Sequence, residues 1–162
     1  MKLCNAEIMK KVKLLEQNKS DILAEERRIN QVTYQTESDK IDFGYSFSET
    51  RKKVEEIDSE IRKLKRLLNH SNATTVVEEF DMTLGECLVY MAQLGNELGI
   101  LEPLARKEPL TRKSTYNGVI EYTVLNYDKA ECMVRLQWVK DTLSGLQIAI
   151  DRTNLTNMID IV

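Results

Sequence analysis

The sequence predicts an all-α fold built from two copies of one antiparallel helical hairpin, and two observations support this prediction. First, the chain of 162 residues contains only two prolines and six glycines, a scarcity that favours long, uninterrupted helices. Second, an apolar stripe with helical spacing, followed by an Asn-x-Thr triplet, occurs twice in one register. We therefore expect a single domain over residues 1–162, with an internal repeat of 1–81 and 82–162.

The clearer apolar stripe lies between Ser48 and Asn72. Its residues alternate steps of three and four, which places them on one face of a helix, and charged residues fill the opposite face. The stripe consists of Val54, Ile57, Ile61, Leu64 and Leu68. Ser46 and Glu49 have the spacing of a capping box, which satisfies free N–H groups at the start of a helix. This segment is predicted as the second helix of the first hairpin.

The same pattern returns 82 residues later. The second stripe consists of Leu136, Val139, Leu143, Leu146 and Ile150. Asp128 and Glu131 are placed to cap its helix. The triplets Asn72-Ala-Thr74 and Asn154-Leu-Thr156 that follow the two stripes are also 82 residues apart. A heptad pattern alone does not explain why both the stripes and the triplets are separated by the same 82 residues, so we infer an internal duplication.

The first helix of each hairpin is predicted from weaker patterns. Residues 3–35 carry apolar residues at steps of seven, which are Ile8, Leu15, Ile22 and Ile29. A Thr83–Glu86 capping box precedes the other apolar series, which consists of Leu84, Leu88, Met91, Leu94, Leu98 and Leu101. Lys2-Leu3 aligns with Thr83-Leu84 at an offset of 81, as one insertion or deletion in a connection would give.

Between the third and fourth helices, the apolar period changes from that of a helix to that of a strand. Residues 120–124 alternate apolar and polar side chains, and the Asn117-Gly118 pair before them is a strong turn signal. The preceding arm, from Leu110 to Tyr116, is a weaker strand. A small β-hairpin is therefore predicted as an insertion between helices three and four.

Four long helices in two hairpins indicate a four-helix bundle or an elongated antiparallel coiled coil. The stripes are as narrow as a coiled-coil seam, so one chain buries little apolar area. A two-stranded hairpin is marginal alone, and its unpaired edges need cover. We therefore expect a homo-oligomer, with a dimer as the commonest case. Its predicted contact residues are Val119, Ile120, Tyr122 and Val124.

The sequence offers no arrangement of residues suited to catalysis or to metal binding. The single histidine, His70, lies at the end of the second helix, where it would pair with the helix dipole. The chain has no Glu-x-x-His motif, no phosphate-binding glycine loop and no Cys-x-x-Cys. We predict no catalytic residue, no metal site and no cofactor.

The repeated Asn-x-Thr triplets are the most distinctive polar feature. Asparagine tolerates the left-handed conformation that ends many helices, and threonine can begin the next turn, so helix capping explains both copies. The alternative is a polar binding patch for a ligand or a partner. That patch would consist of Asn72, Thr74, Asn154 and Thr156. Capping is favoured, and both interpretations stay open.

The charge balance and the cysteines limit which partners and which cellular location are expected. A net charge of −3 and a pI near 5.4 argue against general affinity for nucleic acid or anionic lipid. Polar residues interrupt the most apolar stretch, 84–101, so no membrane span is expected. Cys4, Cys87 and Cys132 lack the spacing of a disulfide framework, and residues 1–15 lack the features of a secretory signal. We therefore predict a cytoplasmic protein.

Several of these motifs together resemble a small bacterial family of uncharacterised helical proteins, many of which carry the label septicolysin. The resemblance is carried by the Lys2-Leu3 and Thr83-Leu84 starts, the strand 120–124 and the closing segment 153–156. It implies the helical fold, and the label implies a pore-forming, membrane-active protein.

We expect a non-enzymatic, self-associating structural or interaction protein of the bacterial cytoplasm, with a further protein partner left open. The alternative that the resemblance suggests is a membrane-active protein, which needs an exposed apolar face broad enough for lipid. A weaker alternative is a nucleic-acid-associated helical protein. It rests on basic runs such as residues 62–66, whose default role is a solvated coiled-coil face.

Overall fold

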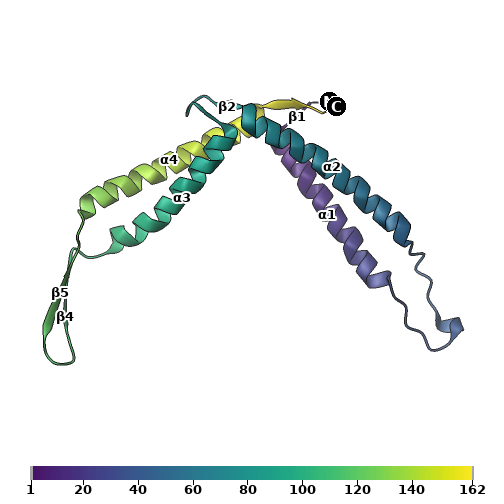
Figure 1. The fold of residues 1–162 in the computed structure, drawn as a ribbon, viewed down its shortest axis with the longest axis horizontal. Coiled ribbons are helices and arrows are strands. Elements are labelled where there is room, and N and C mark those ends of the chain that lie inside the picture. Colours follow the sequence, from purple (N-terminus) through teal and green to yellow (C-terminus); the bar gives the residue numbers. More distant parts are fainter. Residues whose placement is uncertain (1, 162) are drawn as a thin grey trace. The chain divides into compact units, whose positions relative to one another are not determined.

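The computed structural model describes residues 2–161, which are mostly helical, as predicted (Figure 1). Four long helices and three short antiparallel strand pairs form within these residues. In chain order the elements are β1 (Lys2–Cys4), α1 (Asn5–Ile29), η1 (Glu37–Asp39), α2 (Phe47–Thr74), β2 (Val76–Val77), β3 (Met82–Thr83), α3 (Leu84–Arg106), β4 (Leu110–Ser114), β5 (Ile120–Val124), α4 (Lys129–Thr156) and β6 (Met158–Asp160).

The chain divides into two compact units. Unit 1 comprises Met1–Thr74 and Asn154–Val162, and unit 2 comprises Thr75–Thr153. Unit 1 contains α1 and α2, and unit 2 contains α3 and most of α4. The strand that follows the second helix of each pair belongs to the other unit. Thus β6 follows α4 and pairs with β1 in unit 1, while β2 follows α2 and pairs with β3 in unit 2.

Unit 1 is held together by an apolar cluster between α1 and α2. Its buried members are Ile8, Val12, Ile61 and Leu64, and the residues packed around them are Leu3, Leu15, Ile57, Leu68, Ile159 and Ile161. Ion pairs flank this seam, among them Lys19–Asp58 and Lys65–Glu16, each at 2.7 Å. The α2 stripe from Ile57 to Leu68 is therefore a core face, as its spacing predicts.

Unit 2 has its own apolar cluster. The buried members are Val77, Leu84, Cys87, Leu94, Val139, Leu146, Ala149 and Ile150. Leu88, a member of the predicted apolar series, is 42% exposed, whereas its neighbour Cys87 is fully buried. The reason is spacing: with Cys87 in place of Leu88, the α3 stripe alternates steps of three and four without a break. Cysteine therefore serves here as a small apolar residue.

The bounds of the two helical pairs can be compared with the intervals of the sequence pattern. Helices α2 and α4 begin 82 residues apart (47 and 129) and end 82 residues apart (74 and 156). Helices α1 and α3 begin 79 residues apart (5 and 84), so the predicted offset of 81 is wrong. The Glu7 carboxylate accepts a bond from the Cys4 N–H at 2.8 Å, and Glu86 accepts one from the Thr83 N–H at 2.7 Å. Cysteine is an unusual residue at a helix start, so the first of these caps escaped sequence reasoning.

Helix α1 ends earlier than predicted, and helix α3 extends beyond its apolar series, which ends at Leu101. Helix α1 ends at Ile29 rather than at Gln35. Ile29 is the last residue of the apolar series, and the β-branched residues Val32 and Thr33, which have low helix propensity, follow it. Helix α3 continues past Pro103 to Arg106. A proline in the last turn removes one backbone bond where few remain to be made, so its cost there is small.

Candidate functional site

The β4–β5 hairpin, which we call the ribbon (residues 110–124), exposes several large apolar side chains. Every residue of both strands is exposed, and neither apolar cluster includes a ribbon residue. Figure 1 shows the ribbon extending beyond the ends of α3 and α4 within unit 2. A two-stranded hairpin without packing partners is marginally stable alone.

The two faces of the ribbon differ in chemistry. Antiparallel register pairs Leu110 with Val124, Arg112 with Tyr122 and Ser114 with Ile120 on one face, and Thr111 with Thr123 and Lys113 with Glu121 on the other. The first face exposes large apolar side chains, with 62% of Tyr122 and 63% of Val124 accessible to solvent. The second face is wholly polar. The ribbon is thus amphipathic, and its apolar face is open.

The turn of the ribbon follows the sequence signal. The Gly118 N–H donates to the Thr115 carbonyl at 3.0 Å, and the Thr115 N–H donates to the Val119 carbonyl at 2.8 Å. Gly118 has a φ of +72°, a left-handed conformation that glycine adopts without strain. The loop therefore has three residues, a tight turn followed by a left-handed glycine, with Tyr116 fully exposed at its tip.

The structure places three of the four predicted contact residues together. Ile120, Tyr122 and Val124 share the apolar face, since alternate strand residues point the same way. By the same alternation Val119, which is exposed and belongs to the turn, lies on the polar side. Their role in an oligomer stays a prediction.

A buried polar cluster lies in unit 1, close to the Asn-x-Thr triplets in sequence. Asn5 is fully buried, and its side-chain amide donates to Asn154 Oδ1 at 3.2 Å. Ser71, also buried, donates to Asn5 Oδ1 at 3.0 Å and accepts from the Asn157 amide at 2.9 Å. Asn154 is thus the member of the predicted patch that this network contains. Ser71 was identifiable in advance, because it continues the α2 stripe as a polar residue.

The other predicted patch residues have different surroundings. Asn72 is half-buried within α2, and Thr74 and Thr156 are exposed at the ends of α2 and α4. The Thr74 hydroxyl donates to the His70 carbonyl at 2.9 Å, a bond within its own helix. The favoured capping interpretation is wrong in its geometry, because both asparagines are helical. Among the described non-glycine residues, only Asp81 has positive φ.

We expect Asn5→Ala to lower the free energy of unfolding of unit 1 by about 1–3 kcal/mol, because it removes the donor to Asn154 and the acceptor for Ser71. Urea denaturation measures this change. Asn18→Ala, an exposed position on the same helix, is the matched control and should differ little from the parent protein. Equal loss in both variants would show that the cluster contributes nothing specific.

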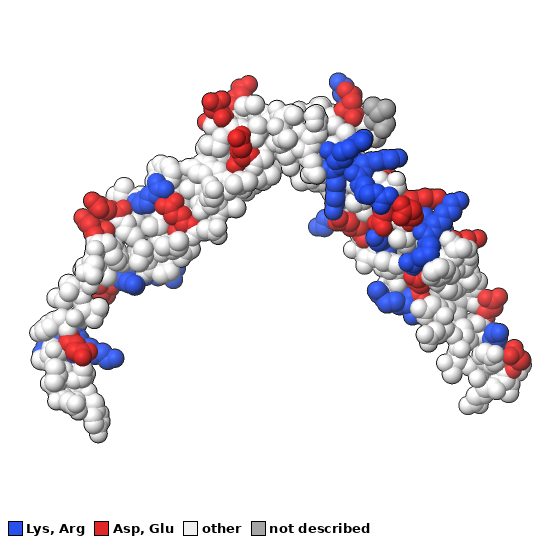
Figure 2. Space-filling view, viewed as in Figure 1, with Lys and Arg blue, Asp and Glu red and all other residues white. Residues whose placement is uncertain are grey.

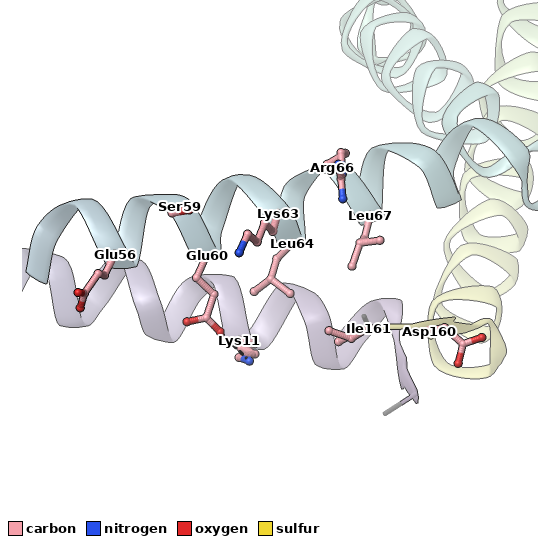
Figure 3. A pocket seen from close by; sticks show the side chains of 10 residues that line it. All are labelled: Lys11, Glu56, Ser59, Glu60, Lys63, Leu64, Arg66, Leu67, Asp160 and Ile161. Carbon is pink, nitrogen blue, oxygen red and sulfur yellow. Dashed lines mark ion pairs between the residues drawn. The ribbon is translucent and has the colours of Figure 1, made fainter.

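Unit 1 also carries a groove of about 670 Å³ between α1, the middle of α2 and the C-terminal segment around β6 (Figure 3). Leu64, Leu67 and Ile161 supply its apolar lining, and the charged residues around it are Lys11, Glu56, Glu60, Lys63, Arg66 and Asp160. Lys11 and Glu60 pair at 2.7 Å. Because three cations face three anions, the groove has no net preference for a charged ligand.

Unit 2 presents a second apolar surface on its helices. On the face shown in Figure 2, charged side chains are dense over α1 and α2 and sparser over α3 and α4. The most exposed apolar residues on these two helices include Ile100 and Val134, at 64% and 71%. Arg135 forms two bonds with Glu97, at 2.6 and 2.9 Å, and lies over the Trp138 ring. The side-chain bond from Arg135 lowers the pKa of Glu97 below its ordinary value.

Within residues 2–161, no three or more histidine, cysteine, aspartate or glutamate side chains come together in a way that could hold a metal ion. None of the helices in this part of the chain combines the length and the apolar character needed to cross a membrane.

No protein-family model and no curated protein matches this chain. Among solved structures, the chain is similar to the crystal structure of a functionally unknown conserved protein from Corynebacterium diphtheriae. The TM-score is 0.68 at 18% sequence identity, and the match covers 99% of this chain and 100% of the other. At this identity the likeness shows a shared fold alone.

Proposed function

We propose that this chain is a non-enzymatic structural or interaction protein that associates with itself, and that the ribbon is its contact. The observation that carries the proposal is the open apolar face of the ribbon. Burying one large aliphatic side chain stabilises a complex by about 1.5–3 kcal/mol before the costs of association. Leu110, Ile120, Tyr122 and Val124 together therefore supply enough area to favour contact with another surface.

The apolar residues exposed along α3 and α4 support the same proposal. We further propose that the two helical pairs are duplicated hairpins, a view supported by the shared 82-residue interval of α2 and α4. The narrow seam between α1 and α2 suits an antiparallel coiled coil, which leaves helix faces available for a bundle with another copy. Three buried thiols, Cys4, Cys87 and Cys132, suit a reducing compartment such as the cytoplasm.

Light scattering of the parent protein at micromolar concentration tests self-association. We expect a mass above that of one chain, 18.7 kDa. Deleting residues 111–123 and bridging the gap with a short Gly/Ser linker should keep the helical circular-dichroism signal and lower the mass. A parent protein that is already a monomer contradicts the proposal. A deletion that changes helicity but not mass would place the interface elsewhere.

Membrane activity is the second candidate, favoured by the same open apolar face and by the septicolysin resemblance. Arg112 lies on that face and Lys113 beside it on β4, which suits an anionic lipid surface. Dye leakage from vesicles containing anionic lipid, lost in the ribbon deletion, would support this candidate. Intact vesicles together with a stable oligomer would favour the first.

A further inference from the structure

The free backbone groups of the ribbon can be assigned from its ladder. The Thr115 N–H donates to Val119, and the Leu125 N–H donates to Pro109 at 3.2 Å. Hydrogen-bonded pairs in an antiparallel ladder alternate along each strand, so the odd-numbered residues of β5 bond to β4. The N–H and C=O groups of Ile120, Tyr122 and Val124 therefore point away from β4, along a free edge.

The opposite edge, formed by β4, is poorly suited to pairing with its own copy. A two-fold axis at Arg112 would set that arginine against its own copy, with Lys113 beside it. Like charges directly opposite one another destabilise a strand pair. Pro109 precedes the strand, and lysine and proline are the residues that natural proteins use to keep edges unpaired.

The β5 edge has the reverse character. Its sequence, Ile-Glu-Tyr-Thr-Val, is rich in β-branched and aromatic residues. A two-fold axis at Tyr122 would set Tyr122 against its copy, Ile120 against Val124 and Glu121 against Thr123. No like charges are directly opposed, and each Glu121 keeps Lys113 across its own ribbon. In this register the residues whose backbone groups point outward, Ile120, Tyr122 and Val124, oppose the same residues of the other copy. Their N–H and C=O groups can therefore form a hydrogen-bonded ladder between the two β5 strands.

We propose, on the basis of the self-association proposed above, that β5 pairs antiparallel with β5 of a second copy of this chain, about a two-fold axis at Tyr122. The result is one continuous sheet in the order β4, β5, β5, β4. The second copy is the occupant because the edge is complementary to itself, as an interface with two-fold symmetry requires. The pairing also sets the apolar faces of both ribbons side by side.

Cysteine cross-linking tests the register. Opposed residues of a hydrogen-bonded pair have Cα atoms about 5.5 Å apart, within the range that a disulfide spans. Oxidised Tyr122→Cys protein is therefore expected to form a linked dimer as its main product. Glu121→Cys is the matched control. In the proposed register Glu121 opposes Thr123 of the other copy, so the two introduced cysteines would be diagonal neighbours about 7–8 Å apart and should stay mostly unlinked. The native cysteines are buried and add little background.

Proline variants test the edge. Tyr122→Pro and Arg112→Pro each remove one outward N–H at the same cross-strand position, from β5 and β4 respectively. With the helical circular-dichroism signal retained, Tyr122→Pro should lower the mass to that of one chain, and Arg112→Pro should not.

Two sets of outcomes separate the proposals. Equal cross-linking of both cysteine variants, or a mass lowered only by Arg112→Pro, would overturn β5 pairing while self-association stands. Ribbons stacked face to face, about 10 Å apart, would leave Tyr122→Cys unlinked in a protein that is still an oligomer, which also overturns the pairing. A parent protein with the mass of one chain contradicts self-association itself.

Discussion

Replacing Ile61 with aspartate is expected to lower the free energy of unfolding of unit 1 by about 3–5 kcal/mol. Ile61 is 8% exposed and lies in the apolar cluster between α1 and α2 with Ile8 and Leu64. Among the described side chains of that cluster none is a cation, so the new carboxylate would lose water without gaining a partner. Thermal unfolding followed by circular dichroism measures the loss.

The matched control for this variant is Lys52→Asp, which introduces the same side chain at an exposed position of the same helix. It should leave the melting temperature nearly unchanged. If Ile61→Asp melts at the parent temperature, the α2 stripe is not part of the core.

Truncating Leu146 to alanine is expected to lower the free energy of unfolding of unit 2 by about 2–5 kcal/mol. Leu146 is fully buried in the cluster formed by α3, α4 and β2, so the change removes apolar contacts and leaves a cavity. Ile148→Ala removes a similar side chain that is 57% exposed on the same helix, and should cost far less. Urea denaturation compares the two, and equal midpoints would contradict the assignment of this core.

Local signals explain which parts of the helices could be predicted. The α2 and α4 stripes and their caps depend on spacings of two to four residues, and residues so close in sequence are neighbours within one or two turns of the same helix. Asp128 Oδ1 accepts the Ala130 N–H at 2.7 Å, and Ser46 Oγ accepts the Glu49 N–H at 3.4 Å, so both predicted helix starts are capped. The Asn117-Gly118 turn is equally local, because it depends on the left-handed conformation of one glycine.

Two of the errors arose where two residues competed for one role. Cys87 and Leu88 are neighbours on α3, and leucine is the commoner core residue, but the helical spacing selects the cysteine. Cys4 precedes α1 as Thr83 precedes α3, although a cysteine side chain gives no capping signal in the sequence. With Cys4 rather than Lys2 in the position of Thr83, α1 and α3 begin 79 residues apart (5 and 84) rather than 81.

The sequence by itself determined the helical class, the apolar faces of α2 and α4, and the position and amphipathic pattern of the ribbon. These features depend on residues that are close together in the sequence, so periodicity and turn residues predict them. Only the tertiary structure showed that β1 pairs with β6, and that Asn5 is buried against Ser71 and Asn154. Strands of two or three residues carry no readable period, and a buried amide looks like a surface one until distant segments meet around it.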